Sequence, residues 1–339
     1  MAQLPDIARF VSSTGVRVYR IPCEVFPNFI GYVYVLLDAG PPTLVDTGSN
    51  FGNCTDQILA GFESVNERFG ESISIQGIER ILITHGHIDH FGGLQKIQEL
   101  TKAPVGVHAL DRRVLSSHEE RVVVATRALK EFLQRAGVDP NFQGRLLEMY
   151  GFSKRHFHSV RVDFLLDEAT PLDGIRFIHV PGHCPGQLCM VIGDILLSAD
   201  HILEITTPHQ APESITANTG LGHYLDSLKK VRAIGGFDIA LGGHEGPVRD
   251  VYARIDEILA SHERKFEKLL GHVADSDAPP TISDLTSKVY TKAQGFHHLL
   301  ALEEIGAHVE YLYERGQLAV VNLDEVEKQH NPPLRYARV

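Results

Sequence analysis

The feature that most constrains the fold of this chain is a dense run of metal-binding side chains directly after an apolar segment. Residues 84–93 read THGHIDHFGG, so three imidazoles and one carboxylate fall within six positions, and residues 81–83 before them are Ile-Leu-Ile. Imidazole nitrogen and carboxylate oxygen are the donors that zinc and neighbouring first-row metals bind, and a catalytic ion needs several of them with one position open. The run therefore indicates a metal site in a loop that leaves a buried strand.

The spacing within the run predicts how the donors divide. Residues i and i+2 of an extended loop point the same way, so His85 and His87 can bind one ion. Asp89 and His90, beyond a bend, would face a second. The chain has 19 histidines, and isolated ones in helices are expected to be structural or solvated, because only convergent ligands make a site. Two such helical histidines are His262 and His308.

The same local order recurs at four more places: an apolar strand, a turn of small residues, and then a histidine or an aspartate. The clearest case is VPGHCPGQ at residues 180–187, where flanking Pro-Gly pairs leave the histidine little freedom. The donors that follow these four strands are Asp46, His183, Asp200 and His244. For Asp46, a plain turn residue that caps the next helix is the alternative interpretation.

Donors at the ends of several strands of a layered sheet converge on one edge, which allows two neighbouring sites. One site is expected to contain His85, His87 and His183. The other is expected to contain Asp89, His90 and His244, with Asp200 bridging the two. Two metals about 3.5 to 4 Å apart would share a water that loses its proton easily.

Composition disfavours several classes of partner. Hydrophobic residues make up 43% of the 339 positions, enough for a sizeable core, and the formal net charge is -11. A phosphate backbone requires a basic surface, so we expect no nucleic-acid partner, and no uncharged apolar run is long enough to span a membrane. We expect a cytoplasmic protein with a small-molecule substrate. Its four cysteines are expected to be free thiols, since no pair has Cys-x-x-Cys spacing.

Periodicity and turn residues predict alternating strands and helices over residues 16–108 and further strands over residues 160–198, which indicates a layered α/β domain. Residues 109–158 between them form a helical insert without metal-ligand spacing. The insert is either an extra helical layer or homodimer surface, or a lid whose side chains line an apolar substrate pocket. The candidate pocket residues are Met149, Tyr150, Phe152 and Phe157.

The chain is expected to divide near residue 272. Residues 1–272 would form the metal-binding domain with its insert. A linker, DSDAPPT, lies at residues 275–281, within the start of a mainly helical C-terminal domain of residues 273–339. Basic residues in this second domain are balanced by acids, which gives little support to RNA binding.

In the order and spacing of its motifs over residues 30–246, the chain resembles the metallo-β-lactamase superfamily, in the hydrolase branch that includes glyoxalase II. The corresponding motifs are Asp46-Thr47-Gly48, residues 84–93, His183, Asp200 and His244. The resemblance implies a four-layer αβ/βα sandwich with a dinuclear metal centre at the sheet edge. It implies that Asp46 supports the metal loop from behind the ligands. The C-terminal domain resembles the small winged-helix-like tail of the family's thioesterase and endoribonuclease-like members.

Departures from the family pattern narrow the reaction. Asp200 stands where zinc β-lactamases of the commonest subclass use cysteine, which disfavours β-lactam hydrolysis. His87 replaces the glutamate of flavodiiron proteins, which disfavours reduction of oxygen or nitric oxide. Leu203 stands where lactonases that open acyl-homoserine lactones usually carry tyrosine. Cys184 replaces a more common threonine, and His201 directly follows the bridging aspartate. Both are expected to alter the surroundings of the ligands.

The donor set and the resemblance together predict a dinuclear metal-dependent hydrolase of an ester or thioester, such as an acyl-thioester or a lactone. A metal-bridging hydroxide would attack the carbonyl, one ion would hold the oxyanion, and Asp89 would both bind metal and orient the nucleophile. Zinc is the expected metal, although histidine and carboxylate also accept iron or manganese. The alternatives are a phosphodiesterase or endoribonuclease with the same metals, a mononuclear iron persulfide dioxygenase, and a ligand-binding pseudoenzyme.

Overall fold

The computed structural model describes residues 3–339, apart from the side chain of Ser153, and places most strands in two sheets. The first sheet has seven strands in sequence order, β1 to β7. Their bounds are Ala8–Val11, Arg17–Phe26, Phe29–Leu37, Thr43–Val45, Arg80–Leu82, Val105–His108 and Phe164–Leu166. Strands β1 to β4 pair antiparallel and β4 to β7 pair parallel, so the carboxyl ends of β4 and β5 meet at one edge.

The second sheet has four strands in the order β11-β10-β9-β8. Their bounds are Arg176–His179 (β8), Leu188–Ile192 (β9), Ile195–Ala199 (β10) and Ile239–Gly242 (β11). Strand β9 runs antiparallel to both β8 and β10, and β10 runs parallel to β11. Strands β8, β10 and β11 therefore all end at the same edge, as β4 and β5 do in the first sheet.

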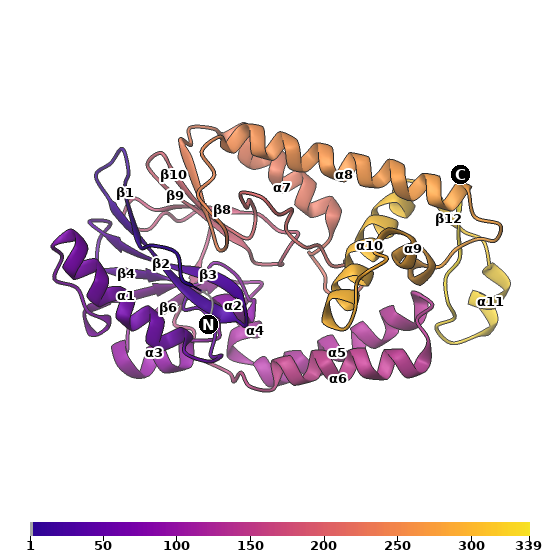
Figure 1. Ribbon diagram of the computed structural model, residues 1–339, viewed down its shortest axis with the longest axis horizontal. Helices are drawn as coiled ribbons and strands as arrows, with labels where there is room; N and C mark the ends of the chain where they lie inside the picture. The colour runs from indigo at the N-terminus through magenta and orange to yellow at the C-terminus, as the bar shows by residue number, and fades with distance from the viewer. Residues whose placement is uncertain (1–2) are drawn as a thin grey trace.

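Helices cover the outer faces of both sheets (Figure 1). Helices α1 (Cys54–Phe69) and α3 (Leu94–Thr101) lie against the first sheet, and α7 (Leu221–Ile234) and α8 (Val251–Ala274) lie over the second. Three short helices lie in the connections of this half: η1 (Ile75–Gly77), α2 (Ile88–Phe91) and α4 (Arg112–Ser116). The order helix, sheet, sheet, helix confirms the four-layer sandwich expected from the sequence.

The alternation of side chains along the strands explains the layers. In β3, Val33 and Val35 point into the core shared with α1 and α3, whereas Tyr34 and Leu36 point into the core between the two sheets. Successive strand residues face opposite sides of a sheet, so a strand with apolar residues at every position is buried on both faces. A third core lies between the outer face of the second sheet and the helices beyond it.

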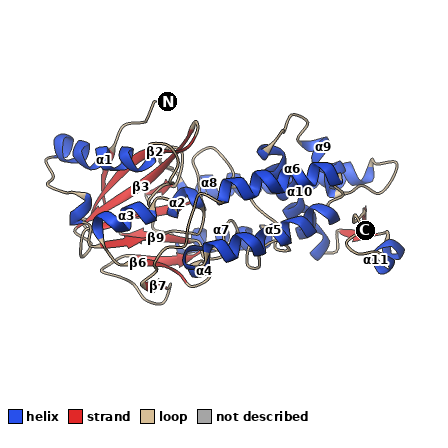
Figure 2. Ribbon diagram, turned by 90° about the horizontal axis from the view of Figure 1, so that it is seen from below, coloured by secondary structure: helices blue, strands red, loops and turns tan. Residues whose placement is uncertain are grey.

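The insert forms two long helices, α5 (His118–Arg135) and α6 (Pro140–Lys154). Figure 2 shows that they extend away from the sheets, toward the C-terminal end of the molecule. The second helix begins where the Asp139 carboxylate accepts hydrogen bonds from the amides of Asn141 and Phe142, with Pro140 at its first position. The insert is thus an arm beside the tail, which the sequence alone did not indicate.

The tail comprises α9 (Ile282–Val289), α10 (Phe296–Glu314), β12 (Leu318–Val320), α11 (Leu323–Lys328) and β13 (Tyr336–Arg338). A capping box between Thr281 and Asp284 starts α9, and β12 pairs antiparallel with β13. Apolar residues of the tail share one core with α5, α6, α7, α8 and the second sheet. Among the residues described, no helix combines the length and apolar character needed to cross a bilayer.

Candidate metal centre

All seven predicted ligands lie beyond strand ends at the edge where the two sheets meet. His85 and His87 lie in the loop after β5, which continues into α2 with Asp89 and His90. The other three follow strands of the second sheet: His183 after β8, Asp200 after β10 and His244 after β11. The structure brings these residues together in the two groups that the spacing predicted.

The first group, called the three-histidine group below, contains His85, His87 and His183, with ligand atoms within 4.8 Å of one another. The Nε2 atom of His85 is 3.1 Å from Nδ1 of His87. The ring of His183 meets those of His85 and His87 edge-on, with centroids 5.3 and 4.5 Å away. Three imidazoles that converge in this way can bind one divalent ion and leave a position open.

The second group, called the aspartate-containing group, contains Asp89, His90, Asp200 and His244, also within 4.8 Å. The Nε2 atom of His244 lies 3.4 Å from Oδ2 of Asp89 and 3.4 Å from Oδ2 of Asp200. The Oδ2 atom of Asp200 is also 3.6 Å from Nε2 of His183, in the three-histidine group. Asp200 therefore lies between the two groups, as expected of a bridging ligand.

Several buried donor atoms of the two groups fit bound cations. Within the described part of the chain, Nε2 of His90, His183 and His244 and Oδ1 of Asp200 are buried without a hydrogen-bond partner. Buried polar atoms are almost always paired, so unpaired atoms that face one another need a ligand. Imidazole and carboxylate are a donor set for zinc, iron or manganese. The residues present thus fit two divalent ions.

Hydrogen bonds behind the ligands orient the rings. The Asp46 carboxylate contacts Nδ1 of His90 at 2.8 Å and also accepts from the amide and hydroxyl of Thr84, both at 2.8 Å. The Thr84 hydroxyl is in turn 3.1 Å from Nδ1 of His85. The Nδ1 atom of His244 is 2.8 Å from the Ile30 carbonyl. Each contact leaves Nε2 of the ring free for an ion, and such partners normally orient metal ligands.

The electrostatics of the two groups differ. Burial lowers the pKa of His85 and of His87 well below the ordinary value, so these rings are neutral and able to bind metal. Burial also opposes protonation of His244, but Asp200 and Asp89 raise its pKa to about 10. For Asp89, burial raises the pKa, but contacts with His244 and His90 outweigh it and keep the carboxyl ionised. The aspartate-containing group therefore holds both carboxylates of the centre, paired with a positively charged histidine.

A glycine keeps the space between these ligands open. A Cβ atom on Gly243 would lie 2.4 Å from Oδ1 of Asp200 and 2.5 Å from Cε1 of His90. Any other residue at this position would displace a ligand. The position before His244 thus requires glycine, because the backbone there approaches the ligands too closely for a side chain.

Comparisons with known proteins agree with this geometry. The model of the Metallo-beta-lactamase superfamily matches residues 27–271, more than half of the chain. The chain belongs to this superfamily. It is 23% identical to the probable metallo-hydrolase YqjP of Bacillus subtilis (strain 168), over 89% of this chain and 93% of that protein. It is 25% identical to the beta-lactamase-like protein 2 homolog of Caenorhabditis elegans, over 84% of this chain and 78% of that protein.

Two solved structures show the same fold. The metallo-beta-lactamase family protein TTHA1429 from Thermus thermophilus has a TM-score of 0.75 at 24% identity, over 95% of this chain and 98% of that chain. A beta-lactamase domain protein from Burkholderia ambifaria has a TM-score of 0.70 at 20% identity, over 98% of this chain and 93% of that chain. The superfamily is one of metallo-hydrolases, which agrees with the ligand groups described above. The assignment to its glyoxalase II-like branch stays a prediction.

Sequence reasoning missed Asp111, which ties two of the ligand loops together in this metallo-beta-lactamase fold. Its fully buried carboxylate accepts the Gly86 amide and the Gly186 amide, both at 2.8 Å. It also accepts the thiol of Cys184 at 3.2 Å, which accounts for the unusual cysteine. Asp111 joins the loop of His85 to the loop of His183, yet its place in the insert gave no local pattern that would have revealed it.

His201 directly follows the bridging aspartate in the chain, and its side chain is buried. The ring packs edge-on against Tyr224, with centroids 5.4 Å apart, and its two nitrogens have no hydrogen-bond partner among the described residues. Burial lowers the pKa of His201 to about 3, so the ring is neutral. Its effect on the surroundings of the ligands stays a prediction.

The four predicted pocket residues occupy different places. Phe157 is buried beneath the metal loop, where its ring fills the space beside Gly92, and Phe152 is 65% exposed. Met149 and Tyr150 are partly buried and pack against the core shared with the tail. Sequence reasoning missed Lys154, whose ammonium lies 5.6 Å from the centroid of the Tyr150 ring. Burial lowers the pKa of Lys154, whereas nearby Asp89 opposes this effect.

A third set of possible ligands lies outside the predicted centre, where His262 of α8 approaches Glu304 and His308 of α10. Most of the polar groups here contact one another, whereas Nε2 of His262 is buried without a hydrogen-bond partner among the described residues. The Nδ1 atom of His262 is 3.0 Å from Nε2 of His308, and the Lys265 ammonium is 2.7 Å from the Glu304 carboxylate. This ammonium already balances the carboxylate charge, so the expectation that these two histidines are structural agrees with the geometry.

Proposed function

We propose that this chain is a dinuclear metal-dependent hydrolase of ester or thioester bonds, such as those of an acyl-thioester or a lactone. The observation on which the proposal rests is the position of Asp200 between two convergent groups of ligands. Two ions bound there, most simply zinc, would polarise the substrate carbonyl and lower the pKa of a shared water. The finer choice of ester or thioester rests on the resemblance of the motifs to that hydrolase branch.

The residues around the centre supply the remaining parts of such a reaction. Asp89 is ionised and lies 3.4 Å from His244, so its carboxylate can accept a hydrogen bond from an attacking water and orient it. No protein nucleophile is required. Cys184 is a poor candidate, because burial raises the pKa of its thiol and the thiol donates to Asp111. A protonated Lys154 near Asp89 would attract an anionic group of the substrate.

The proposed substrate is a small molecule. A net charge of -11 opposes the approach of a polyanion, which disfavours RNA and supports a compact ester or thioester. The insert arm brings the apolar side chains of Met149 and Tyr150 beside the tail, where they can contact an acyl group. The packing of these side chains against the core is also what the extra helical layer predicts, so the lid role is the part of the proposal that the substrate panel tests.

The test is a panel of thioesters, lactones and bis-p-nitrophenyl phosphate, assayed with the metal-loaded chain and two variants. We expect turnover of a thioester or a lactone that falls about 10²- to 10⁴-fold in Asp89→Asn, the range for loss of a positioned acid–base group. Asp226→Asn is the matched control, because Asp226 is an exposed residue whose ion pair is with Lys229. Cleavage of the phosphodiester alone would contradict the proposal and favour the phosphodiesterase alternative.

A further inference from the structure

The orientation of His183 depends on a main-chain carbonyl far along the chain. The Nδ1 atom of His183 lies 2.7 Å from the carbonyl oxygen of His209. The ring must donate from Nδ1 to this oxygen, which leaves the lone pair of Nε2 directed at the three-histidine group. The loop that carries His209 therefore fixes both the tautomer and the direction of a ligand.

Helix α10 of the tail holds that loop through two consecutive glutamates. The Oε2 atom of Glu303 is 3.1 Å from Nε2 of the His209 ring. The Oε2 atom of Glu304 accepts the amide of Gln210, the next residue, at 2.9 Å. The Glu303 and Glu304 side chains are only 12% and 9% exposed, so these contacts are shielded from water and from salt. One carboxylate thus holds the ring of the loop, and the other holds its backbone.

Glu304 is itself fixed from two helices. Its Oε1 atom accepts from the Lys265 ammonium of α8 at 2.7 Å, and its own carbonyl is 2.6 Å from Nδ1 of His308, one helical turn later. These groups lie against the apolar core shared by the tail, the insert and the second sheet. Both oxygens of the buried Glu304 carboxylate are paired, so displacing this side chain would cost it two partners without a gain of water contacts.

We propose that α10 is a positioning element of the metal centre, in which Glu303 and Glu304 hold the loop whose carbonyl orients His183. The proposal rests on the proposed metal binding. It assigns the tail a role in ligand geometry at the three-histidine group, and it predicts no direct effect on the aspartate-containing group. Such supporting contacts typically change metal affinity about 10- to 100-fold.

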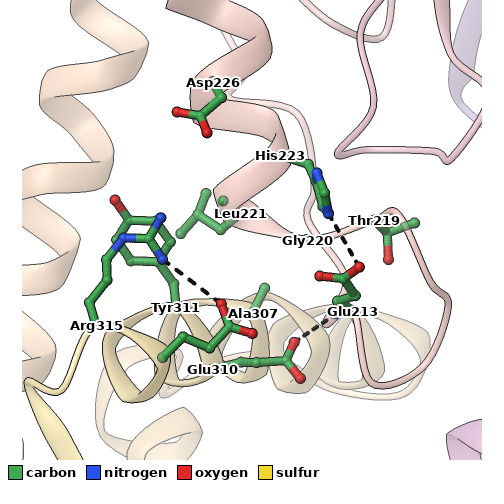
Figure 3. A pocket seen from close by; sticks show the side chains of 12 residues that line it. Glu213, Thr219, Gly220, Leu221, His223, Asp226, Ala307, Glu310, Tyr311 and Arg315 are labelled. Atoms are coloured by element: carbon green, nitrogen blue, oxygen red, sulfur yellow. Dashed lines mark hydrogen bonds and ion pairs between the residues drawn. The ribbon is translucent and has the colours of Figure 1, made fainter.

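The same helix provides a matched control. Glu310 accepts the amide of Glu213 at 2.7 Å and that of Ser214 at 3.2 Å, in the same connection between β10 and α7. Figure 3 shows this contact in a surface pocket, with Glu213 also paired to His223. Glu310 therefore holds backbone amides of the same loop from the same helix, but no residue that lines its pocket is one of the seven ligands.

The experiment measures stepwise zinc affinity by competition with a chromogenic chelator, together with thermal unfolding of the metal-free chains. Glu304→Gln leaves one oxygen for two donors, Glu303→Leu removes the acceptor for the His209 ring, and Glu310→Gln is the control. We expect one of the two zinc dissociation constants to rise at least 10-fold in Glu304→Gln and Glu303→Leu, and both to stay unchanged in Glu310→Gln. The same constant should be the one lost in His183→Ala.

The possible outcomes separate this inference from the proposed function. A wild-type chain that binds fewer than two zinc ions would overturn the proposed dinuclear function on which it rests. If the wild type binds two ions, the inference is wrong when both glutamate variants keep both affinities, or when Glu310→Gln loses as much as they do. Glu303 stands outside the ion pair of Lys265 with Glu304, so Glu303→Leu still decides the matter if Glu304→Gln fails to fold.

Discussion

The two ligand groups are built from the same kinds of side chain but are held in different ways. In the aspartate-containing group, the rings of His90 and His244 are oriented by Asp46 and by the carbonyl of Ile30, both of which belong to the first sheet or its strand ends. In the three-histidine group, His183 is oriented by the His209 carbonyl, in a loop held by the tail.

The aspartate-containing group is therefore held by the first sheet, whereas the three-histidine group also depends on the insert and the tail. Strand ends that meet at an edge position ligands by topology alone, and this part can be read from strand-and-turn patterns. The three-histidine group also needs Asp111 of the insert and α10 of the tail. The insert and tail of this chain therefore contact the loops that carry ligands of the three-histidine group.

The largest expected effect comes from the residue that both groups share. Asp200→Ala removes the carboxylate that approaches His90, His183 and His244, and leaves their buried nitrogens without a counter-charge. We expect loss of at least one bound ion and a fall in activity of about 10³-fold or more, because a metal ligand and transition-state charge stabilisation are lost together. Elemental analysis and the ester panel measure both. Retention of two ions and near-normal turnover would refute the bridging position.

A smaller effect is expected for the support that serves both groups. Asp46→Ala removes the partner of His90 directly and that of His85 through Thr84. Affinity for both ions should fall, by about 10- to 100-fold for the ion at His90 and by less for the other. Stepwise zinc titration distinguishes this result from that of Glu304→Gln, in which the affinity for only one of the two ions should fall. If zinc affinity fell only at the three-histidine group, Asp46 would not be the support of His90 described here.

Asp111 tests whether the insert supports one group selectively. Asp111→Ala would leave the buried amides of Gly86 and Gly186 unpaired, at a cost of about 1 to 3 kcal/mol for each. We expect the free energy of unfolding, measured in urea, to fall by about 2 to 6 kcal/mol. Zinc affinity should fall chiefly at the three-histidine group, because both loops carry its ligands. Asp111→Asn keeps one acceptor oxygen and should lose less in both measurements.

The smallest effect concerns the acid stability of the contact between α8 and the tail, where His262 meets His308. Burial, together with nearby His308, lowers the pKa of His262 to about 3. Below its ordinary pKa of about 6.5, the unfolded chain binds a proton that the folded chain refuses. Its stabilising contribution is therefore complete above pH 6.5 and lost as pH falls toward 3, by up to about 1.4 kcal/mol per pH unit.

The variant that isolates this contribution is His262→Phe, compared with the wild type by urea unfolding of the metal-free chain at pH 7 and pH 5. We expect the wild type to lose more stability between the two pH values than the variant does. An equal loss would show that His262 accepts a proton in the folded state and that the network beside Glu304 is less tightly packed than described.

Local patterns predicted a layered α/β domain and the grouping of ligands, and the resemblance of the motifs to a known family added the four-layer sandwich. Apolar runs mark strands, and a turn of small residues before a histidine or aspartate marks a strand end at the common edge. Asp111 was missed because its carboxylate accepts from backbone amides 25 and 75 residues away in sequence. His209 was missed because its own backbone carbonyl contacts a ring 26 residues away. Helix α7 was missed although Leu221, Leu225 and Leu228 have helical spacing, since its start after Gly220 carries no capping side chain.

The measurement that tests the central claim most directly is the zinc content of the wild-type chain and of two single-ligand variants, purified without chelator. We predict two divalent ions per chain in the wild type, with about one retained in His87→Ala and about one in His90→Ala, because each variant removes a ligand of a different group. One ion per chain in the wild type, or the same single iron in all three proteins, would contradict the dinuclear account and favour a mononuclear enzyme.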